Sequence, residues 1–213
     1  MPNESEPRAI GLHYLGSNSD GLTARAQDVV DAAVMFSHAT PADYFFVSGK
    51  QFRPDRENTA AQDLAQSLID RGIPKDRIIR DDTHPSTTSY EMQHFVNEAH
   101  ARGIKELVTI TSRTHQPTIM DLTPRRMVGK VPEVRVFAYE DILTTFPNDP
   151  TERERYEARF TERSEAADEA KWRNYEATKQ KISHLPVVGR VLGRVFEQAT
   201  NLLSWLKRPQ VTD

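Results

Sequence analysis

The sequence predicts an α/β protein with a Rossmann-like three-layer fold. Short apolar runs rich in β-branched and aromatic residues alternate with stretches whose apolar residues recur at helical spacing. Each strand, helix and strand repeat has the length of a right-handed crossover between parallel strands. The run at 106–111 is apolar and then turns polar, as a buried parallel strand does at its carboxyl end. We therefore expect a five-stranded parallel sheet in the order 3-2-1-4-5, followed by a C-terminal helical extension.

Composition limits the class of protein. The chain has 213 residues, of which 37% are hydrophobic and 28% charged, as in water-soluble globular proteins. Its net charge of -3 gives no overall field that would attract nucleic acid, and none is expected as a partner. The absence of cysteine excludes disulfides, thiolate nucleophiles and cysteine-ligated metals. We find no signal peptide and no run of the roughly 18 apolar residues that a membrane span needs, so we expect a cytoplasmic protein.

The first expected strand, 9–15, runs into a glycine-bounded loop and a helix that Thr23 can cap. Backbone amides of such a loop and the helix N-terminus can point at an anion, so the loop is a candidate phosphate cradle. The spacing of Gly16, Gly21 and Thr23 resembles a P-loop, but Leu22 stands where that motif has lysine. We therefore do not predict a P-loop. A tight strand-to-helix turn without a ligand is an equal alternative.

The middle of the chain continues the alternation. We expect a second strand at 43–47, a helix at 58–71, a third strand at 78–79 and a helix that ends at Arg102. The loop between this third strand and the following helix is the densest polar cluster of the sequence. Asp81, Asp82 and His84 are of the right types for a divalent metal, but three polar residues in a loop are a weak pattern and no metal is expected.

The helix after this loop has two interpretations at its start. Thr88 and Glu91 fit a capping box, in which the hydroxyl and the carboxylate accept from the first free amides of the helix. The alternative is that Glu91 takes part in catalysis. Both interpretations place the carboxylate at the first turn of the helix.

The fourth strand, 106–111, and the fifth, 134–138, complete the expected sheet. Pro117 is tolerated in the first turn of the helix between them, whereas Pro124 should end or kink that helix. With strands one and four as neighbours, the loops after Leu15 and Thr111 face each other at the point where the strand order reverses. Open α/β sheets bind ligands at that point, so we expect a site there.

Several short motifs follow these elements in a fixed order. They are Leu15-Gly16, Arg25, Ser48-Gly49, Gly72-Ile73-Pro74, the segment from Ser86 to Glu91, and Thr111-Ser112 with His115. In this order and spacing, over residues 10–137, the chain resembles the YdcF-like family, which includes SanA and ElyC. The resemblance implies a Rossmann-like parallel sheet, binding of S-adenosylmethionine or a nucleotide, and a link to envelope or polysaccharide metabolism. The chain departs from the family at Lys50, Ala60, Thr88 and Thr118.

The candidate site residues lie at the expected strand ends. His115 is the best general acid or base, because the pKa of imidazole is nearest neutrality, although a structural hydrogen bond is an equal alternative. Glu91 would orient it or polarise water. Arg25 and Lys50 would hold an anionic group. Ser112 is expected to cap a helix, because no glycines of a nucleophile elbow flank it. The expected ligand-binding residues are Gly16, Ser17, Asn18, Arg25, Ser48, Gly49, Lys50, Ser86, Thr88, Thr111, Ser112 and Arg113.

The character of the chain changes after residue 146, so we expect an α/β domain at 1–146 and a helical extension at 147–213. Thr151 and Glu154 fit a capping box before a charged helix at 152–181 that carries a few aromatic residues. From Val187 to Leu206 an apolar stripe follows at helical spacing. It would be buried in a helical hairpin, in a second subunit or protein partner, or in a membrane surface, where Trp205 and nearby cations would suit anionic headgroups.

Two functions are consistent with these patterns. The first is a YdcF-like hydrolase or transferase that acts on a small phosphorylated or nucleotide-type ligand, with S-adenosylmethionine among the candidates. The second is a non-catalytic module that senses such a ligand and docks a partner or a membrane surface through its C-terminal amphipathic helix.

Overall fold

The computed structural model of the chain describes residues 6–18, 21–50, 57–84, 87–127, 130–131, 133–147 and 149–165. The chain forms two compact units, Met1–Arg163 and Ser164–Asp213. The second unit lies outside the described residues except for the end of one helix. The expected apolar stripe at 187–206 and most of the charged helix at 152–181 therefore fall outside the described part.

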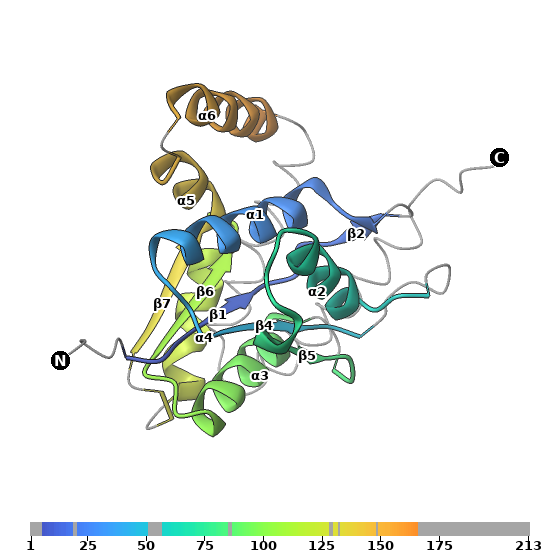
Figure 1. Ribbon diagram of the computed structural model, residues 1–213, viewed down its shortest axis with the longest axis vertical. Coiled ribbons are helices and arrows are strands. Elements are labelled where there is room, and N and C mark those ends of the chain that lie inside the picture. The colour runs from blue at the N-terminus through green and yellow to red at the C-terminus, as the bar shows by residue number, and fades with distance from the viewer. Residues whose placement is uncertain are drawn as a thin grey trace, which may run out of the picture. The chain divides into compact units, whose positions relative to one another are not determined.

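The first unit contains a five-stranded, all-parallel sheet, which confirms the expected fold class (Figure 1). The central strand is β1, which pairs with β4 on one side and β6 on the other, and the order is β5-β4-β1-β6-β7. These numbers differ from the expected 3-2-1-4-5 because two short strands, β2 and β3, form a separate antiparallel pair after β1. The strands are β1 Arg8–Leu12, β2 Ser17–Asn18, β3 Gly21–Leu22, β4 Tyr44–Ser48, β5 Ile78–Asp81, β6 Glu106–Thr111 and β7 Glu133–Ala138.

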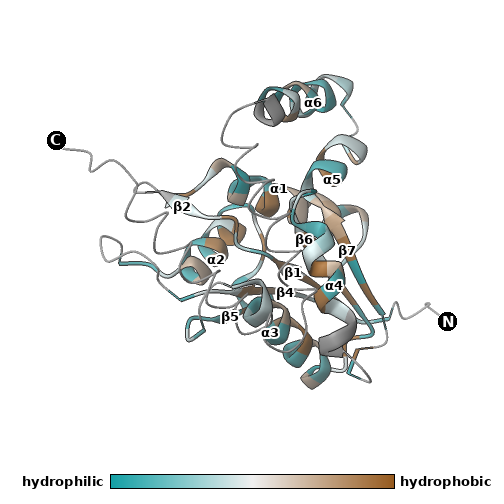
Figure 2. Cartoon of the chain, turned by 180° about the vertical axis from the view of Figure 1, so that it is seen from behind, coloured by the Kyte–Doolittle hydropathy of each residue, from teal (hydrophilic) through white to brown (hydrophobic). Residues whose placement is uncertain are grey.

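Helices cover both faces of the sheet and complete the three layers. Apolar residues of α1, α2 and α5 form one core with the sheet, and those of α3 and α4 form another on the opposite face. Figure 2 shows apolar residues along the strands, whereas α6 is mainly hydrophilic. The helices are α1 Ala24–Ala39, α2 Ala60–Asp70, the 3₁₀ turn η1 Lys75–Arg77, α3 Thr88–Ala101, α4 Gln116–Met127, α5 Tyr139–Thr145 and α6 Pro150–Glu165.

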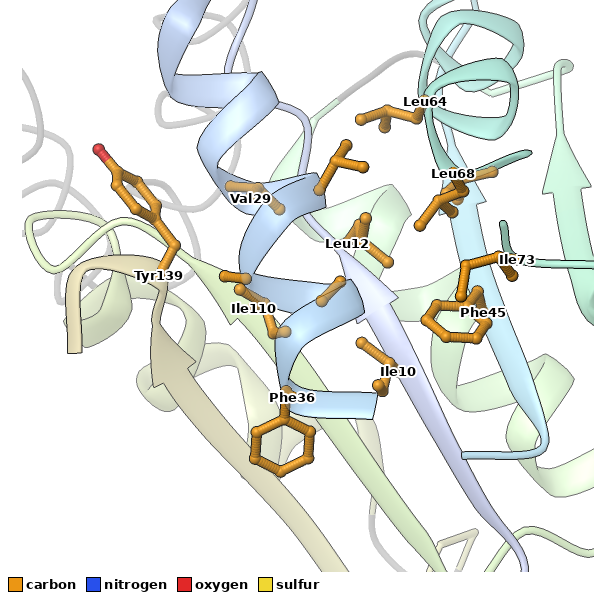
Figure 3. Close-up of a cluster of buried hydrophobic side chains, with 14 of the residues drawn as sticks. Ile10, Leu12, Val29, Phe36, Phe45, Leu64, Leu68, Ile73, Ile110 and Tyr139 are labelled. Carbon is orange, nitrogen blue, oxygen red and sulfur yellow. The ribbon is translucent and has the colours of Figure 1, made fainter. Parts of the chain in front are cut away.

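Alternation along β1 decides which residues face each helical layer. Ile10 and Leu12 belong to the core under α1, and Figure 3 shows them in one cluster with Val29. Ala9 belongs to the opposite core, and a Cβ added to Gly11 would lie 2.5 Å from the ring of Phe95 on α3. A larger residue would therefore press on this ring where β1 passes under α3. The strand ends at Leu12, three residues earlier than expected, and the next residue continues the alternation toward α3.

Some helix ends follow the expected local patterns. Thr23 caps α1 as expected, because its hydroxyl accepts from the amide of Ala26. The capping box expected at the start of α3 is wrong: the N-cap is Thr87, which makes no side-chain cap, and the Glu91 carboxylate bonds elsewhere. A capping box that the sequence interpretation missed is present at Thr59, before α2.

Helix α4 does not end at Pro124, which was one of the two outcomes expected there, but continues to Met127. One expectation for α6 is also wrong. The capping box expected at Thr151 does not form, because α6 already begins at Pro150 and the amide of Thr151 donates to the carboxylate of Asp149. An aspartate immediately before a proline is an equally good helix start. Its carboxylate accepts from the amide of Thr151, which Glu154 would have bonded in the capping box.

Helix α6 packs on the α/β unit through its aromatic residues. Tyr156 and Phe160 contact the core under α1, and the ring centroids of Tyr139 and Phe160 are 5.7 Å apart. Arg159 forms an ion pair with Asp28, a buried carboxylate of α1. These contacts explain why the first unit extends to residue 163 instead of ending at the expected 146. Of the helices in the described ranges, none is long and apolar enough to cross a membrane.

Candidate functional site

Buried polar side chains gather where β1, β4 and β6 end. His13 follows β1, Ser48 ends β4, and Thr111 and Ser112 end and follow β6; all four are buried. These three strands are neighbours at the centre of the sheet. Because parallel strands present their carboxyl ends at one edge, these polar groups meet on the same side of the molecule, at the point where open α/β sheets hold ligands.

His13 and Glu91 form a buried pair at this edge. The Nδ1 atom of His13 lies 2.8 Å from one carboxylate oxygen of Glu91, and the amide of Tyr14 donates to the other at 3.2 Å. Their side chains are only 1% and 3% exposed. An ionised carboxylate only accepts hydrogen bonds, so the proton between the two groups lies on His13 Nδ1. A buried carboxylate needs such partners, because leaving it unpaired costs several kcal/mol, on the order of 3–5.

His115 lies beside this pair. Its ring centroid is 6.2 Å from that of His13, with an angle of 64° between the rings. The Nε2 atom lies 2.8 Å from the hydroxyl of Thr88, in the first turn of α3, and the main-chain amide donates to Ser112 Oγ at 3.3 Å. His115 is 5% exposed. Ser112 holds the turn that leads into α4, which begins at Gln116: its hydroxyl accepts from the amide of His115 and its carbonyl accepts from the amide of Gln116, which are the bonds of the expected cap.

The turn after β6 is also tied to helix α5. The amide of Arg113 donates to the carboxylate of Glu140 at 2.9 Å, and its guanidinium donates to Asp141 at 2.6 Å. Burial raises the pKa of Glu140, although the bonds from backbone amides lower it in part. Arg113 was expected to bind a ligand, but the structure directs its exposed side chain to α5.

Part of the loop after β1 is folded on itself. Ser17–Asn18 and Gly21–Leu22 pair as a small hairpin, so part of the loop backbone is already bonded. The amide of Thr23 donates to the carbonyl of Gly16, which adopts a positive φ of 106°. Ser17 accepts from the hydroxyl of Tyr14 at 2.6 Å. The side chain of Asn18 lies outside the described residues, and so does Ser86.

The remaining expected residues differ in burial. Within the described chain, the hydroxyls of Ser48 and Thr111 are buried and have no hydrogen-bond partner. Gly49 is buried and donates its amide to the carbonyl of Asp81. Lys50 is exposed, and Arg25 is half-buried in the first turn of α1.

His13 is the site residue that the sequence interpretation missed. It lies within the expected first strand, where a histidine looks like an ordinary member of the alternation. The position of His13 could have identified it as a site residue, because the last residues of a central parallel strand reach the edge of the sheet where ligands bind. Its partner Glu91 is 78 residues away, too far for any local pattern to show.

Asp81 and Asp82, which the sequence offered as weak metal candidates together with His84, are directed to different partners. Burial raises the pKa of Asp81, but hydrogen bonds from Thr83 and His84 outweigh it and lower that pKa to about 2. Asp82 turns instead to Arg80, at 2.6 Å, and to Thr59. In the described ranges, no group of three or more histidine, aspartate or glutamate side chains is arranged to hold a metal ion.

The fold and this cluster define a Rossmann-like α/β protein with a polar site at the carboxyl edge of its sheet. No protein-family model matches the sequence, and no curated protein matches it.

Proposed function

We propose that this chain is a YdcF-like protein that binds a small phosphorylated or nucleotide-type ligand where β1, β4 and β6 end, and acts on it as a hydrolase or transferase. The observation that carries the proposal is the buried pair of His13 and Glu91 beside His115. The motif resemblance supports the same proposal and adds a role in envelope or polysaccharide metabolism. S-adenosylmethionine belongs to the same ligand class, because it contains a purine nucleoside.

Burial of these groups is difficult to explain by stability alone. A carboxylate and two imidazoles lose their hydration here, and apolar residues of similar volume would stabilise the fold as well or better. The three groups come from a strand end, a helix and a turn that are distant in the sequence. Titratable groups gathered at the ligand edge of an open α/β sheet are typical of a functional site.

The side chains would have different roles in the proposed reaction. His115 would take a proton from the attacking water or hydroxyl, or give one to the leaving group. Thr88 would hold the ring of His115 in place through its bond to Nε2. Glu91 would hold His13 in one tautomer and orientation. The buried hydroxyls of Ser48 and Thr111 would bond the ligand.

A thermal-shift screen with nucleotides, S-adenosylmethionine and sugar phosphates tests ligand binding. A ligand at 100 times its Kd stabilises the native state by about 2.7 kcal/mol, which raises the Tm of a chain of this size by about 5–10 °C. A ligand found in this way is then tested for turnover. We expect His115→Ala to abolish turnover, and His100→Ala, a substitution of an exposed histidine on α3, to leave it unchanged. Equal turnover by His115→Ala would contradict the proposed role.

One observation favours the second candidate function, a ligand-sensing or scaffold module. His13, Glu91 and His115 are at most 5% exposed, and the expected cations Lys50 and Arg113 do not bond to them. This module would bind the ligand without reaction and pass the signal to a second copy, a protein partner or a membrane surface through residues 187–206. Retained affinity in His115→Ala, with no turnover by the wild type, would favour it.

A further inference from the structure

The turn between β6 and α4, which carries His115, is bonded to two other elements of the fold. From α3, the hydroxyl of Thr88 lies 2.8 Å from Nε2 of His115. From α5, the carboxylate of Glu140 accepts from the main-chain amide of Arg113 at 2.9 Å. The first bond holds the imidazole ring, and the second holds the backbone of the turn two residues before it.

Helix α5 offers two neighbouring carboxylates to Arg113, and the two bond different parts of that residue. Glu140 bonds the main chain, whereas Asp141 accepts from the guanidinium at 2.6 Å. The side chains of Arg113 and Asp141 are 62% and 53% exposed, so this ion pair contributes little to stability. A bond to an exposed side chain fixes only that side chain. The bond from Glu140 fixes the path of the turn itself.

Bonds within the turn connect Arg113 to His115. The carbonyl of Ser112 accepts from the amide of His115 at 3.0 Å, and its hydroxyl lies 3.3 Å from the same amide and 3.1 Å from the hydroxyl of Thr114. These contacts leave the few residues of the turn little freedom to move separately. A displacement of Arg113 would therefore be passed on to His115.

The charge of Glu140 is not explained by the stability of the fold. Burial raises the pKa of Glu140, although the bonds from its own amide and from that of Arg113 lower it in part. A raised pKa means that folding favours the protonated form, so the ionised carboxylate makes the fold less stable at neutral pH. Glutamine would have the same shape without this cost. The carboxylate therefore calls for a role other than stabilising α5.

We propose that Glu140 is a positioning residue for His115: by holding the amide of Arg113, its carboxylate fixes the turn between β6 and α4 and with it the place of the imidazole. The role rests on the proposed function, in which His115 transfers a proton. Such a transfer requires hydrogen-bond reach, about 2.6–3.2 Å between the heavy atoms, so a small displacement of the turn would slow it. Glu140 acts through the turn and is not itself a catalytic residue.

Amide hydrogen exchange and NMR of the full chain without ligand test the proposal. Glu140→Gln keeps the shape of the side chain but replaces a charged acceptor by a neutral one, which bonds an amide about half as strongly. We expect the amide of Arg113 to exchange about 5- to 10-fold faster in this variant, and the ring signal of His115, assigned by its loss in His115→Ala, to move. Asp141→Asn, the matched control at the next position, should change neither.

A second substitution removes the acceptor altogether. In Glu140→Ala we expect the amide of Arg113 to exchange more than about 10-fold faster than in the wild type. Stability separates positioning from an ordinary structural contact, because Glu140→Gln should keep or raise the Tm at pH 7. Unchanged exchange of Arg113, or an unmoved His115 signal, in the Glu140 variants would overturn the proposal. So would a His115 signal that Asp141→Asn moves equally.

Failure of this inference and failure of the proposed function give different results. Where turnover is found, Glu140→Gln should lower kcat on the order of 10-fold and leave KM unchanged, since the residue acts only through His115. Turnover that depends on His115 but has the same kcat in Glu140→Gln would refute the positioning role and leave the proposed enzyme. Faster exchange and a moved His115 signal, without any turnover by the wild type, would refute the enzyme and leave the hold of Glu140 on the turn.

Discussion

Replacement of Gly11 by alanine tests how the central strand and α3 fit together. The added Cβ would lie 2.5, 2.9 and 2.9 Å from three carbons of the Phe95 ring, whereas carbon atoms in contact are normally about 3.5–4.0 Å apart. The ring must therefore move by about 1 Å. Phe95 is fully buried between Phe46, His94 and His13, so it has no free space to enter.

The expected cost follows from this geometry. Overpacking of a filled core costs about 1–3 kcal/mol, and alanine in a strand regains about 0.5–1 kcal/mol of backbone entropy relative to glycine. Gly11 does not adopt a positive φ, so no backbone strain adds to the cost. We expect Gly11→Ala to lower the free energy of unfolding by about 1–2 kcal/mol and the Tm by about 2–8 °C.

Urea denaturation of a double-mutant cycle provides the assay. In a Phe95→Leu background the ring is absent, so Gly11→Ala should cost little or become neutral. The Phe95 ring lies 5.2 Å from that of His13, so Gly11→Ala should also weaken ligand binding at the strand ends. Equal stability of Gly11→Ala and the wild type, or the same cost in both backgrounds, would refute the steric argument.

Three further predictions concern the charged groups. Arg159→Ala should lower the free energy of unfolding, measured by urea denaturation, by about 1–3 kcal/mol, because the buried carboxylate of Asp28 loses its ion-pair partner. Glu91→Gln should weaken ligand binding at least about 10-fold by calorimetry, because the neutral amide holds the His13 N–H less strongly. Asp81 has a folded-state pKa of about 2, below its ordinary 3.8, so its stabilising contribution is complete above pH 3.8 and is lost as the pH falls through about 2. Asp81→Asn should therefore be less stable than the wild type at pH 6 and equally stable near pH 2.

Each of these predictions has an outcome that contradicts it. Arg155→Ala, on an exposed position of α6, is the matched control for Arg159→Ala, and equal effects of the two would mean that the ion pair contributes nothing. Unchanged affinity in Glu91→Gln would show that the carboxylate is not needed at the site. A stability difference between Asp81→Asn and the wild type that persists near pH 2 would assign the effect to something other than ionisation.

The sheet was predictable because its signals are local. The fourth strand was expected at 106–111 and is found at Glu106–Thr111, since a run of β-branched and apolar residues between turns specifies a buried strand. The end of β1 was not predictable. Gly-Leu-His-Tyr-Leu continues to alternate past Leu12, but the chain leaves the sheet there, and the Glu91 carboxylate receives the Tyr14 amide.

The candidate site was predicted in part, for a similar reason. His115 and Glu91 were identified by residue type and position, but Glu91 was also read as a cap because Thr88 precedes it by three residues. Thr88 and Glu91 instead bond partners 27 and 78 residues away, contacts that no local pattern contains. The cavity that Asp81, Tyr90 and His94 line beside β5 was not expected, because a histidine on a helix is usually exposed to solvent, and the burial of His94 depends on Phe46 of β4.

Glu91, His94 and Phe95 lie on one side of α3 within little more than one turn, and each has a different partner: the strand ends, the cavity beside β5 and the core, respectively. One residue inserted near its start would turn the later positions by about 100° about the axis and separate all three from their partners. The positions of these residues along α3 therefore matter more than the amino-acid composition of the helix. Substitutions are tolerated only at positions that face solvent. A rigid rotation of α3 would also move Glu91 and His94 together, so a change at the strand ends would shift the lining of the cavity beside β5.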